Sequence, residues 1–598
     1  MAGTPADMSA CFPRNASPPW QNLPAWCVLD TAWGDGSRFL SAWQSWQRDA
    51  QRPRMLHYVA ICEQAPDIES LQRSINLFPE LRAHARSLTR QWFGLLPGFH
   101  RIHLSAGHLL LTLCIGELKT ILREQHFTAD SVFLGAYTAP SESAHWALKA
   151  VARCCRRGTA LVSGDVNENL RDDLARLGFE FDSQSNDDYM EGVFNPRWDL
   201  KNSRGGRPVT AALATPPGNC VVIGAGLAGA SIAASLARRG WKVQVLDAAD
   251  APAAGASGLP AGLAVPHNSP DNSPRSRLSR AGLRLTLEQA RTVLTPGQDF
   301  EECGTLERRL DGALGLPGNW TMAGREWSCE IINTINAAAD AALWHGHGAW
   351  IKPTKLVKAW LSAPGVRFVP NAQVKNLALS PKGWELTGDA GQSLATAHLV
   401  VMAAAGGSLA LLRNLRPDTT DIPVDRINSM GELGGQVSWG LHQPGDAAEF
   451  PETPVNGSGS FIPAVPQPDG LAWFAGATYE PLGSPYHQKA SVQTQHQENL
   501  RKLDVLLPYC AARLQPRFKD GDIQEWSGVR CATADRLPVV DVIQIGAAQA
   551  GTPVCLGVST AMGSRGLSLC VLCAELIAAR LHAEPLPVES RLARLLQA

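Results

Sequence analysis

Residues 219–247 read NCVVIGAGLAGASIAASLARRGWKVQVLD: a strand-like run, a glycine-rich turn, a helical stretch and a second strand-like run. In the turn, Gly224 would make the tight bend, Gly226 would let the backbone approach a pyrophosphate, and Gly229 would let the helix pack close to the strand. The helix N-terminus would offer free N–H groups to phosphates. Asp247 ends the second run at the spacing of a carboxylate that binds ribose hydroxyls. This stretch predicts a dinucleotide-binding βαβ unit.

Further glycine-bearing turns bear on which dinucleotide is bound. The run GASG follows the βαβ unit, an apolar strand-like run at 399–405 leads into two glycines, and GSRG opens a helical run near the C-terminus. The residues of these turns are Gly255, Ser257, Gly258, Gly406, Gly563, Ser564, Arg565 and Gly566. A second helix N-terminus beside the ligand could stabilise negative charge on a reduced flavin ring. One long cofactor touched from opposite ends of this sequence suggests FAD.

The charge balance excludes a globally basic chain. Lys plus Arg number 54 and Asp plus Glu 55, for a net charge of −1 over 598 residues. A nucleic-acid binder would therefore need its basic residues gathered on one face. The runs 153–157, 204–207 and 275–280 are rich in arginine and could contact phosphates, or could simply be solvated surface. The 45% hydrophobic content excludes a disordered chain.

Targeting and metal signals are absent from the sequence pattern. The longest apolar runs, such as 109–115, are too short to span a membrane, and the N-terminus lacks the basic and apolar regions of a signal peptide. The 14 cysteines are scattered, which favours free thiols in a reducing cytoplasm. Cys570 and Cys573 have no second Cys or His pair nearby, so we expect no metal site.

A linker divides the chain in two. Residues 195–217 are rich in Gly, Pro and polar residues and show little periodicity. On either side, at 1–194 and 218–598, strand-like and helix-like segments alternate. This succession predicts an α/β protein with two Rossmann-type, doubly wound parallel sheets.

The second part carries five motifs in order: GAGLAGASIAASLARRGWKVQVLD, GASG, GATYE, VRCATADRLPVV and GSRG. On these, residues 218–598 resemble the FAD-dependent oxidoreductase half of the bifunctional tRNA 5-methylaminomethyl-2-thiouridine biosynthesis proteins, the MnmC family, within the D-amino-acid oxidase and glycine oxidase superfamily. The resemblance implies an FAD-binding Rossmann domain with an inserted α+β substrate lobe, at about 286–345 and 425–525. It also implies that the backbone of Val374, in NAQVKNL, meets the adenine.

The resemblance implies a reaction on tRNA. FAD would oxidise the carbon between nitrogen and carboxylate in carboxymethylaminomethyl-uridine at the wobble position, and imine hydrolysis would leave aminomethyl-uridine and glyoxylate. Arg530 would grip the substrate carboxylate with two parallel hydrogen bonds. Arg565 would lie close to the flavin, and Tyr479 would line the substrate pocket. Each of the three could instead be a structural side chain.

One departure from the family falls beside the expected flavin ring. The family commonly follows GASG with Asn, Arg and Gln, whereas this chain has Leu259, Pro260 and Ala261. We expect FAD binding to survive, because backbone contacts carry much of it. The change bears instead on the fit to the usual substrate.

The first part resembles the methyltransferase half of the same family over about residues 20–185. The matching runs are CVLDTAWGDGSRFLSAWQSW, LHYVAICEQAP, QWFGLLPGFHRIHL, LLLTLCIGEL and FLGAYTAPSESAHW. The resemblance implies that Gly34 and Gly36 form the turn that approaches S-adenosylmethionine, with Asp30 before them. Glu63, after the second strand, would bind the ribose. The family has glycine where Ala32 stands.

A second departure affects methyl transfer itself. At the fourth strand the family has an acidic residue followed by Gly-Phe-Ala-Pro, whereas this chain has Gly135 and then AYTA. The missing carboxylate would orient the methyl-accepting amine and balance its charge. The nearest acid, Asp130, lies at the far end of the same strand. The domain either still methylates weakly, by proximity alone, or is kept as a scaffold or tRNA-docking surface.

Three classes of function remain open from the sequence. The first is a flavoenzyme that modifies the tRNA wobble uridine. The second is an FAD-dependent amine or amino-acid oxidase acting on a free small molecule. The third is a non-catalytic tRNA-binding protein that keeps FAD for structure. Salt-dependent tRNA binding would separate the second from the others.

Overall fold

The computed structural model describes residues 20–598 except 78, 136–141, 167, 182–188, 201–212, 310–314, 334–339, 416–424, 483–489 and 549–550. The chain divides into two compact units. Unit 1 consists of Met1–Pro216 and Ala578–Arg594, and unit 2 of Pro217–Ile577 and Leu595–Ala598. No helix within the described residues is long and apolar enough to cross a membrane.

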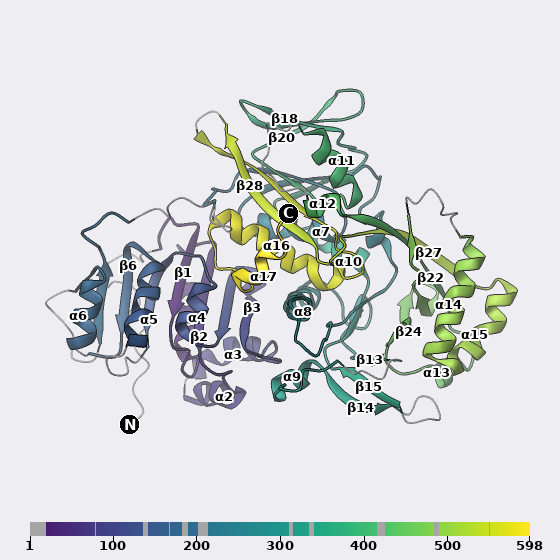
Figure 1. The fold of residues 1–598 in the computed structure, drawn as a ribbon, viewed down its shortest axis with the longest axis horizontal. Coiled ribbons are helices and arrows are strands. Elements are labelled where there is room, and N and C mark those ends of the chain that lie inside the picture. The colour runs from purple at the N-terminus through teal and green to yellow at the C-terminus, as the bar shows by residue number, and fades with distance from the viewer. Residues whose placement is uncertain are drawn as a thin grey trace. The chain divides into compact units, whose positions relative to one another are not determined.

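Unit 1 is built on an eight-stranded sheet with strand order β3-β4-β2-β1-β5-β6-β8-β7 (Figure 1). The five central strands are parallel: β4 (Leu109–Ile115), β2 (Met55–Cys62), β1 (Ala25–Asp30), β5 (Ala129–Leu134) and β6 (Cys155–Ser163). The edges are antiparallel: β3 (Gly98–Leu104), β8 (Met190–Phe194) and β7 (Phe179–Phe181). The strand order reverses between β1 and β5, which is where a doubly wound fold binds its ligand.

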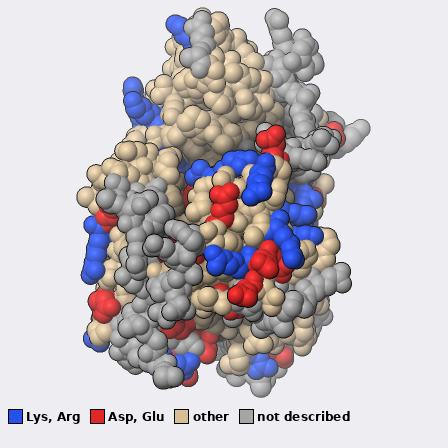
Figure 2. All heavy atoms as spheres, turned by 90° about the vertical axis from the view of Figure 1, so that its left-hand side faces the viewer, with Lys and Arg blue, Asp and Glu red and all other residues tan. Residues whose placement is uncertain are grey.

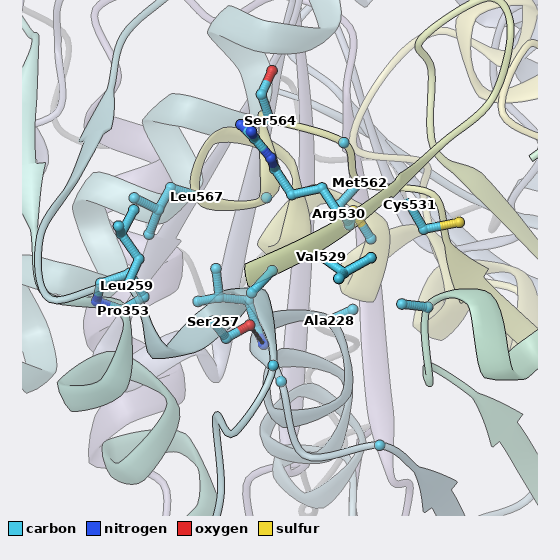
Figure 3. Close-up of a pocket in the computed structure, with 18 of the residues that line it drawn as sticks. Ala228, Ser257, Leu259, Pro353, Val529, Arg530, Cys531, Met562, Ser564 and Leu567 are labelled. Atoms are coloured by element: carbon cyan, nitrogen blue, oxygen red, sulfur yellow. Dashed lines mark hydrogen bonds between the residues drawn. The ribbon is translucent and has the colours of Figure 1, made fainter. Parts of the chain in front are cut away.

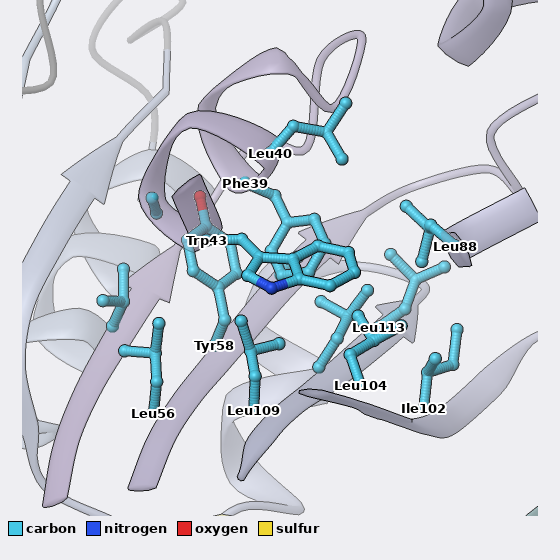
Figure 4. Close-up of a cluster of buried hydrophobic side chains, with 14 of the residues drawn as sticks. Phe39, Leu40, Trp43, Leu56, Tyr58, Leu88, Ile102, Leu104, Leu109 and Leu113 are labelled. Atoms are coloured by element: carbon cyan, nitrogen blue, oxygen red, sulfur yellow. The ribbon is translucent and has the colours of Figure 1, made fainter. Parts of the chain in front are cut away.

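Helices cover the sheet of unit 1 because its central strands are apolar on both faces. The helices are α1 (Ser37–Arg48), α2 (Ile68–Leu77), α3 (Arg82–Thr89), α4 (Leu118–Arg123), α5 (Glu142–Arg153), α6 (Glu168–Arg176) and α17 (Ser590–Arg594). One core cluster is rich in aromatic rings. Figure 4 shows Phe39 and Trp43 of α1 packed with Tyr58 of β2, and the Phe39 and Tyr58 rings meet edge to face at 5.0 Å. Such pairs add to the stability gained by burial.

Residues 578–594, near the end of the chain, belong to unit 1. The Arg101 guanidinium donates to the carbonyl of Pro585 at 2.5 Å, and Gln125 both donates to and accepts from the backbone of Leu586. These contacts satisfy buried polar groups that would otherwise be costly. The sequence assigned all of 218–598 to the second part. The structure instead groups residues 578–594 with the first part, because they contact residues such as Arg101 and Gln125. These contacts join segments more than 450 residues apart, so the order of residues along the chain did not predict them.

Unit 2 contains a six-stranded sheet with strand order β17-β10-β9-β21-β29-β28. Its strands are β9 (Asn219–Ile223), β10 (Lys242–Leu246), β17 (Val366–Val369), β21 (Leu399–Met402), β29 (Pro553–Thr560) and β28 (Val539–Ala547), and only β28 among them runs antiparallel to its neighbour. The quoted stretch forms β9, α7 (Leu227–Arg238) and β10, as its pattern predicts. Other helices of this unit are α8 (Pro274–Val293), α10 (Pro353–Leu361), α11 (Gly406–Asn414), α12 (Asp425–Asn428) and α16 (Gly566–His582).

Unit 2 contains a second large sheet, which is mixed and has nine strands. Its strands come from two stretches, 305–345 and 431–532. They are β13 (Thr305–Arg308), β14 (Cys329–Asn333), β15 (Asp340–His345), β22 (Gly431–Leu441), β23 (Val455–Gly457), β24 (Gly459–Gln467), β25 (Gly470–Gly476), β26 (Glu480–Pro481) and β27 (Gln524–Ala532). Two helices pack on it through a shared apolar cluster, α14 (Val492–Leu506) and α15 (Pro508–Asp520). An α+β lobe is thus inserted within a Rossmann-type domain.

Short elements complete unit 2. Two three-stranded sheets are formed by β11 (Gly262–Ala264), β16 (Ala349–Ile351) and β12 (Phe300–Glu301), and by β18 (Asn376–Ser380), β19 (Gly383–Thr387) and β20 (Ser393–Ala397). The remaining helical turns are η4 (Ala256–Gly258), α9 (Met322–Trp327) and α13 (Asp446–Glu449).

A buried ion network joins α7 to α16. The carboxylate of Glu575, which is 0% exposed, accepts from Arg239 Nη2 at 2.9 Å, Arg238 Nη2 at 3.0 Å and Ser235 Oγ at 2.7 Å. A buried carboxylate is tolerated only when it is paired and hydrogen-bonded in this way. The network fixes the two helices whose N-termini both face the cavity described below.

We expect Glu575→Gln to destabilise unit 2 by about 3 kcal/mol, because it leaves buried arginine charge without its counter-ion. Chemical unfolding monitored by circular dichroism measures the change. Glu498→Gln is the matched control, since its carboxylate pairs with Arg501 on an exposed surface and should be nearly neutral. Equal stabilities of the two variants would contradict the role given to Glu575.

Candidate functional site

A cavity of about 910 Å³ lies in unit 2. It is lined where β9, β10 and β21 end and where α7, α10 and α16 begin. Parallel strands of an open sheet bind ligands beyond their carboxyl ends. Residues of the inserted lobe complete the wall, among them Gly435 and Arg530 of the nine-stranded sheet and Tyr479 between β25 and β26. The cavity therefore lies between the dinucleotide fold and the inserted lobe.

Two positions in the turn 224–229 require glycine, because neighbouring backbone atoms lie too close for a side chain. Gly224 has φ of +108°, and a Cβ there would lie 2.6 Å from the carbonyl oxygen of Ala403. A Cβ at Gly229 would lie 1.8 Å from the carbonyl oxygen of Gly224, so this glycine brings α7 against β9. Gly224 and Gly226 line the cavity, whereas Gly229 supports them from behind.

Polar groups at this turn suit a ribose and a pyrophosphate. The amide of Leu227, at the start of α7, donates to Ser257 Oγ at 2.9 Å. The Asp247 carboxylate accepts from the amides of Ala225 at 2.6 Å and Ala249 at 2.9 Å. Each of its oxygens keeps a lone pair for a ribose hydroxyl. Asp247, Ser257 and Gly255 all line the cavity.

Of the other residues predicted to bind the cofactor, some line the cavity and others pack against neighbouring residues outside it. Val374 lines the cavity together with Gln373 and Lys375. Gly258 does not; a Cβ there would lie 2.8 Å from the carbonyl oxygen of Ala253. Gly406 packs against the Glu432 carboxylate, and its neighbours Ala405 and Gly407 line the cavity in its place.

The turn 563–566 brings a second helix start and an arginine to the cavity. Gly563, with φ of +55°, donates its amide to the carbonyl of Cys531 at 2.9 Å, and all four residues of the turn line the wall. The half-buried Arg565 guanidinium makes no hydrogen bond or ion pair with another described side chain. Burial, followed by the nearby charge of Arg275, lowers the pKa of Arg565. This cation is therefore available to an anionic ligand.

Arg530 is held by three neighbours on the lobe. Its Nη2 donates to the carbonyl of Thr478 at 3.0 Å, and its guanidinium lies 4.4 Å from the centre of the Tyr479 ring. A Cβ at Gly435 would lie 2.1 Å from Nη2, so only glycine leaves room for the side chain. Lys502 Nζ lies 5.2 Å from the same Tyr479 ring. The Tyr479 ring thus contacts two cations. Its cation–π contact with Arg530 helps to hold that guanidinium in place.

Figure 3 shows how these residues lie around the cavity. Arg530 extends past Met562 toward Ser564, while Leu259 lies with Pro353 and Leu567 on the opposite wall. Leu259 and Ala261 line the cavity and pack with Ile462 and Phe474, so this wall is apolar. Pro260 is not among the lining residues.

Several lining residues had no signal in the sequence. Asn456, Ser460 and Trp526 come from strands of the lobe, and Asn414 from the end of α11. None belongs to a charged motif, and the glycine-bearing run NGSGS at 456–460 joins two strands and does not open a helix as a phosphate-binding turn would. Their place in the wall depends on how the lobe packs on the dinucleotide fold.

In unit 1 the residues predicted for S-adenosylmethionine meet at the carboxyl end of β1. The fully buried Asp30 carboxylate accepts from Arg38 Nη2 at 3.0 Å, Tyr58 Oη at 2.7 Å and the Ala32 amide at 3.1 Å. Burial raises the pKa of Asp30, although Arg38 and Tyr58 act in the opposite direction. The turn that follows has Gly34 at φ +62° and Gly36 at φ +80°. Glu63 is exposed directly after β2.

Gly135 and Ala32 occupy the same small space. A Cβ at Gly135 would lie 2.4 Å from the Cβ of Ala32, although the backbone of Gly135 is not in the left-handed region. Its amide donates to Thr31 Oγ1 at 2.9 Å, which ties the end of β5 to the end of β1. Asp130, at the other end of β5, accepts from Arg156 Nε at 3.0 Å and from the Cys27 amide at 2.8 Å. It does not replace the missing carboxylate.

Within the described residues, no three His, Cys, Asp or Glu side chains gather in a way that could hold a metal ion. The cysteines with described positions are free and mostly buried, and burial raises the pKa of Cys531, beside the cavity, to about 11. Cys531 is therefore a thiol at neutral pH.

Two family models match the chain. One, described as FAD dependent oxidoreductase, matches residues 219–580, and the other, described as S-adenosyl-L-methionine-dependent methyltransferase, matches residues 79–186. A relative from Polaromonas sp. (strain JS666) is 45% identical over 601 residues, covering 97% of this chain and 91% of the relative, and one from Albidiferax ferrireducens is 44% identical over 604 residues, covering 97% and 93%. Both are named tRNA 5-methylaminomethyl-2-thiouridine biosynthesis bifunctional protein MnmC. A glycine oxidase structure from Geobacillus kaustophilus is 19% identical, covers 61% of this chain and 94% of its own, and has a TM-score of 0.43.

We expect the substitutions Gly135→Ala and Ala32→Gly to be coupled. Gly135→Ala alone overpacks the end of β5 and should destabilise unit 1 by about 1–3 kcal/mol. In the double variant, removal of the Ala32 methyl group makes room for the new methyl group at position 135. The coupling energy between the two substitutions should therefore offset most of that cost. Unfolding monitored by tryptophan fluorescence gives all four corners of the cycle.

Gly164→Ala is the matched control in unit 1, because a Cβ there meets no atom within 4 Å and its φ is ordinary. If Gly135→Ala is as mild as this control, the two positions do not share one space.

Proposed function

The chain belongs to the family of bifunctional tRNA 5-methylaminomethyl-2-thiouridine biosynthesis proteins, and from this premise we propose that it modifies the wobble uridine of tRNA. The reaction takes place in the cavity of unit 2. The carboxymethyl group is removed oxidatively from 5-carboxymethylaminomethyl-(2-thio)uridine, giving 5-aminomethyl-(2-thio)uridine. The observation that carries this proposal is one cavity that contains the glycine turn and helix start for a dinucleotide together with two unneutralised arginines.

The residues of this cavity fit FAD. Gly224 and Gly226 leave an open backbone surface, the positive end of the α7 dipole at the lining residue Ala228 favours a pyrophosphate, and Asp247 suits a ribose. The start of α16 would stabilise negative charge at the other end of the cofactor. When bound there, FAD supplies a two-electron acceptor for oxidation of a C–H bond beside an amine.

Arg530 binds the substrate carboxylate in this proposal. One of its nitrogens is held by Thr478, which leaves the rest of the guanidinium for a charge-assisted, bidentate contact. Tyr479 and Gly435 fix its position, and such positioning is a large part of what a flavoenzyme's protein contributes.

Arg565 adds a second cation to the same wall. Two guanidinium groups near a bound secondary amine disfavour its protonated form, so the substrate nitrogen keeps the lone pair that its oxidation needs. Leu259, Ala261 and Phe474 make the opposite wall apolar and limit access of water. Loss of two electrons and two protons from the neutral amine, one hydrogen from the carbon and one from the nitrogen, gives an imine. Addition of water then splits the imine into aminomethyl-uridine and glyoxylate.

Unit 1 retains features of a binding site for S-adenosylmethionine but lacks the group that would position the methyl acceptor. The turn of Gly34 and Gly36 and the exposed Glu63 suit the cofactor, whereas the Asp30 carboxylate is already shared by three donors. At Gly135 there is no carboxylate, and the Ala32 methyl group leaves no room for one. We therefore propose that aminomethyl-uridine is the main product.

The direct test uses purified protein and tRNA that carries carboxymethylaminomethyl-uridine, with and without S-adenosylmethionine. We expect nucleoside analysis to show aminomethyl-uridine in both samples. Methylaminomethyl-uridine in the second sample would show that unit 1 methylates without an acid at position 135. Unchanged nucleoside in both samples, with flavin bleached by free glycine or sarcosine, would instead indicate a small-molecule oxidase.

Arg530→Ala should lower kcat/KM for the modified tRNA about 10- to 100-fold, because a charge-assisted pair with the carboxylate is lost. The protein should remain yellow, since Arg530 contributes no contact to the dinucleotide turn. Steady-state kinetics and the flavin absorbance measure both. Arg501→Ala, which removes an exposed arginine paired with Glu498, is the control. A rate unchanged from wild type would remove Arg530 from the substrate site.

A tRNA-modifying role also implies a location in the cytoplasm, where its substrate is found.

A further inference from the structure

Trp146 in unit 1 is an exposed tryptophan in contact with two lysines. It lies on α5, and 38% of its surface is exposed. The ammonium group of Lys149, one turn further along α5, lies 4.6 Å from the centre of its ring. That of Lys119, on the neighbouring helix α4, lies 5.5 Å from the same ring. Two helices thus contribute to one small surface, which we call the Trp146 platform.

The Trp146 platform lies near the ligand-binding edge of the sheet in unit 1. Helix α4 follows β4 and helix α5 follows β5, and both strands are among the parallel ones. Lys119 is the second residue of α4, and Trp146 lies in the second turn of α5. Both side chains are therefore close to the carboxyl ends of the strands. The turn of Gly34 and Gly36 opens at the same edge.

No described residue neutralises the charges of the platform. No carboxylate in the described part of the chain pairs with Lys119 or Lys149, and neither has another recorded polar partner. Four residues further on, Arg123 and Arg153 extend the same helix faces and are also exposed. On the face of the molecule drawn in Figure 2, Lys and Arg gather near the middle, with Asp and Glu among them. Lys119, Lys149, Arg123 and Arg153 thus place four cations on two neighbouring helices, in a chain with a net charge of −1.

A lone exposed tryptophan needs no explanation, but this combination of groups has a specific chemistry. A nucleic-acid base stacks on an aromatic ring irrespective of its sequence, and this stacking is a main source of affinity for single strands. Ammonium groups beside the ring suit the phosphates that flank the stacked base. The wobble uridine of a tRNA lies in a single-stranded loop, where bases are free to stack on a protein.

We propose that the Trp146 platform binds the anticodon loop of tRNA, with one loop base stacked on Trp146 and adjacent phosphates paired with Lys119 and Lys149. This inference rests on the proposed function and identifies part of the surface that recognises its substrate. It also gives unit 1 a role that does not depend on methyl transfer, which Gly135 and Ala32 hinder.

The test measures binding of tRNA bearing carboxymethylaminomethyl-uridine, and of its isolated anticodon stem-loop, by fluorescence anisotropy at several salt concentrations. Trp146→Ala should raise Kd about tenfold or more for both RNAs, whereas Trp146→Phe, which keeps an aromatic face, should stay within about threefold of wild type. The double variant Lys119→Ala/Lys149→Ala should weaken binding and make the dependence on salt shallower by about two counter-ions.

The matched control is Trp198→Ala, which removes another exposed tryptophan of unit 1 (49% exposed) that has no recorded lysine contact; its affinity should equal that of wild type. Flavin reduction by the isolated modified nucleoside should be the same in all variants, since this reaction needs only unit 2.

The outcomes separate the inference from the function on which it rests. If wild type binds tRNA and both the Trp146→Ala and the double lysine variants bind it equally well, the platform is not the docking surface and the proposed function stands. If wild type neither binds nor modifies tRNA, both fall. Thermal melting of each variant shows whether it is folded. If Trp146→Ala fails to fold, tRNA binding by the Lys119→Ala/Lys149→Ala variant tests the proposal, because these two side chains lie outside the core.

Discussion

The buried ion pair between Glu575 and Arg239 sets the position of the two helices on which the candidate site depends. Helix α7 begins at the glycine turn and helix α16 at the turn 563–566, and Glu575 near the middle of α16 pairs with Arg239 at the C-terminal end of α7. More than 300 residues separate the two helices in the chain. Because both helices begin at one cavity, their dipoles favour negative charge on a ligand there. The paired charges make this arrangement specific, since any shift of one helix would leave a charge buried alone.

Close packing then determines which side chains reach the ligand. Gly224, Gly229 and Gly435 each occupy a place where a Cβ would overlap a neighbouring atom, and each allows an approach that no other residue would. At Gly435 the neighbour is Arg530, so a glycine in the lobe makes room for a guanidinium on the adjacent strand. Tyr479 and Thr478 hold the same side chain from the other side. The cation is thus placed in advance, so the proposed binding of a carboxylate would cost little side-chain entropy.

The two units differ in how well they agree with their family's chemistry. In unit 2 the departures at Leu259 and Ala261 fall on an apolar wall and leave the cationic wall intact. In unit 1 the departures at Ala32 and Gly135 meet in one space, where the resemblance led us to expect a carboxylate. The fold of unit 1 is nevertheless complete, with a full sheet, two core clusters and residues 578–594 packed into it. A unit that keeps its fold but lacks the expected carboxylate is consistent with the proposed role in binding tRNA.

The sequence by itself determined the α/β class, the βαβ unit at 219–247 and the glycine turns, because these depend on local periodicity and on backbone geometry that only glycine adopts. It also brought out the change at Gly135, which is a matter of residue identity. Tertiary structure alone decided which glycines line the cavity and which, such as Gly258 and Gly406, serve packing. It alone placed residues 578–594 in unit 1, coupled Ala32 to Gly135, and surrounded Trp146 with two lysines. Each of these results from contacts between segments far apart in the chain, and the spacing of residues along a sequence contains no information about such distances.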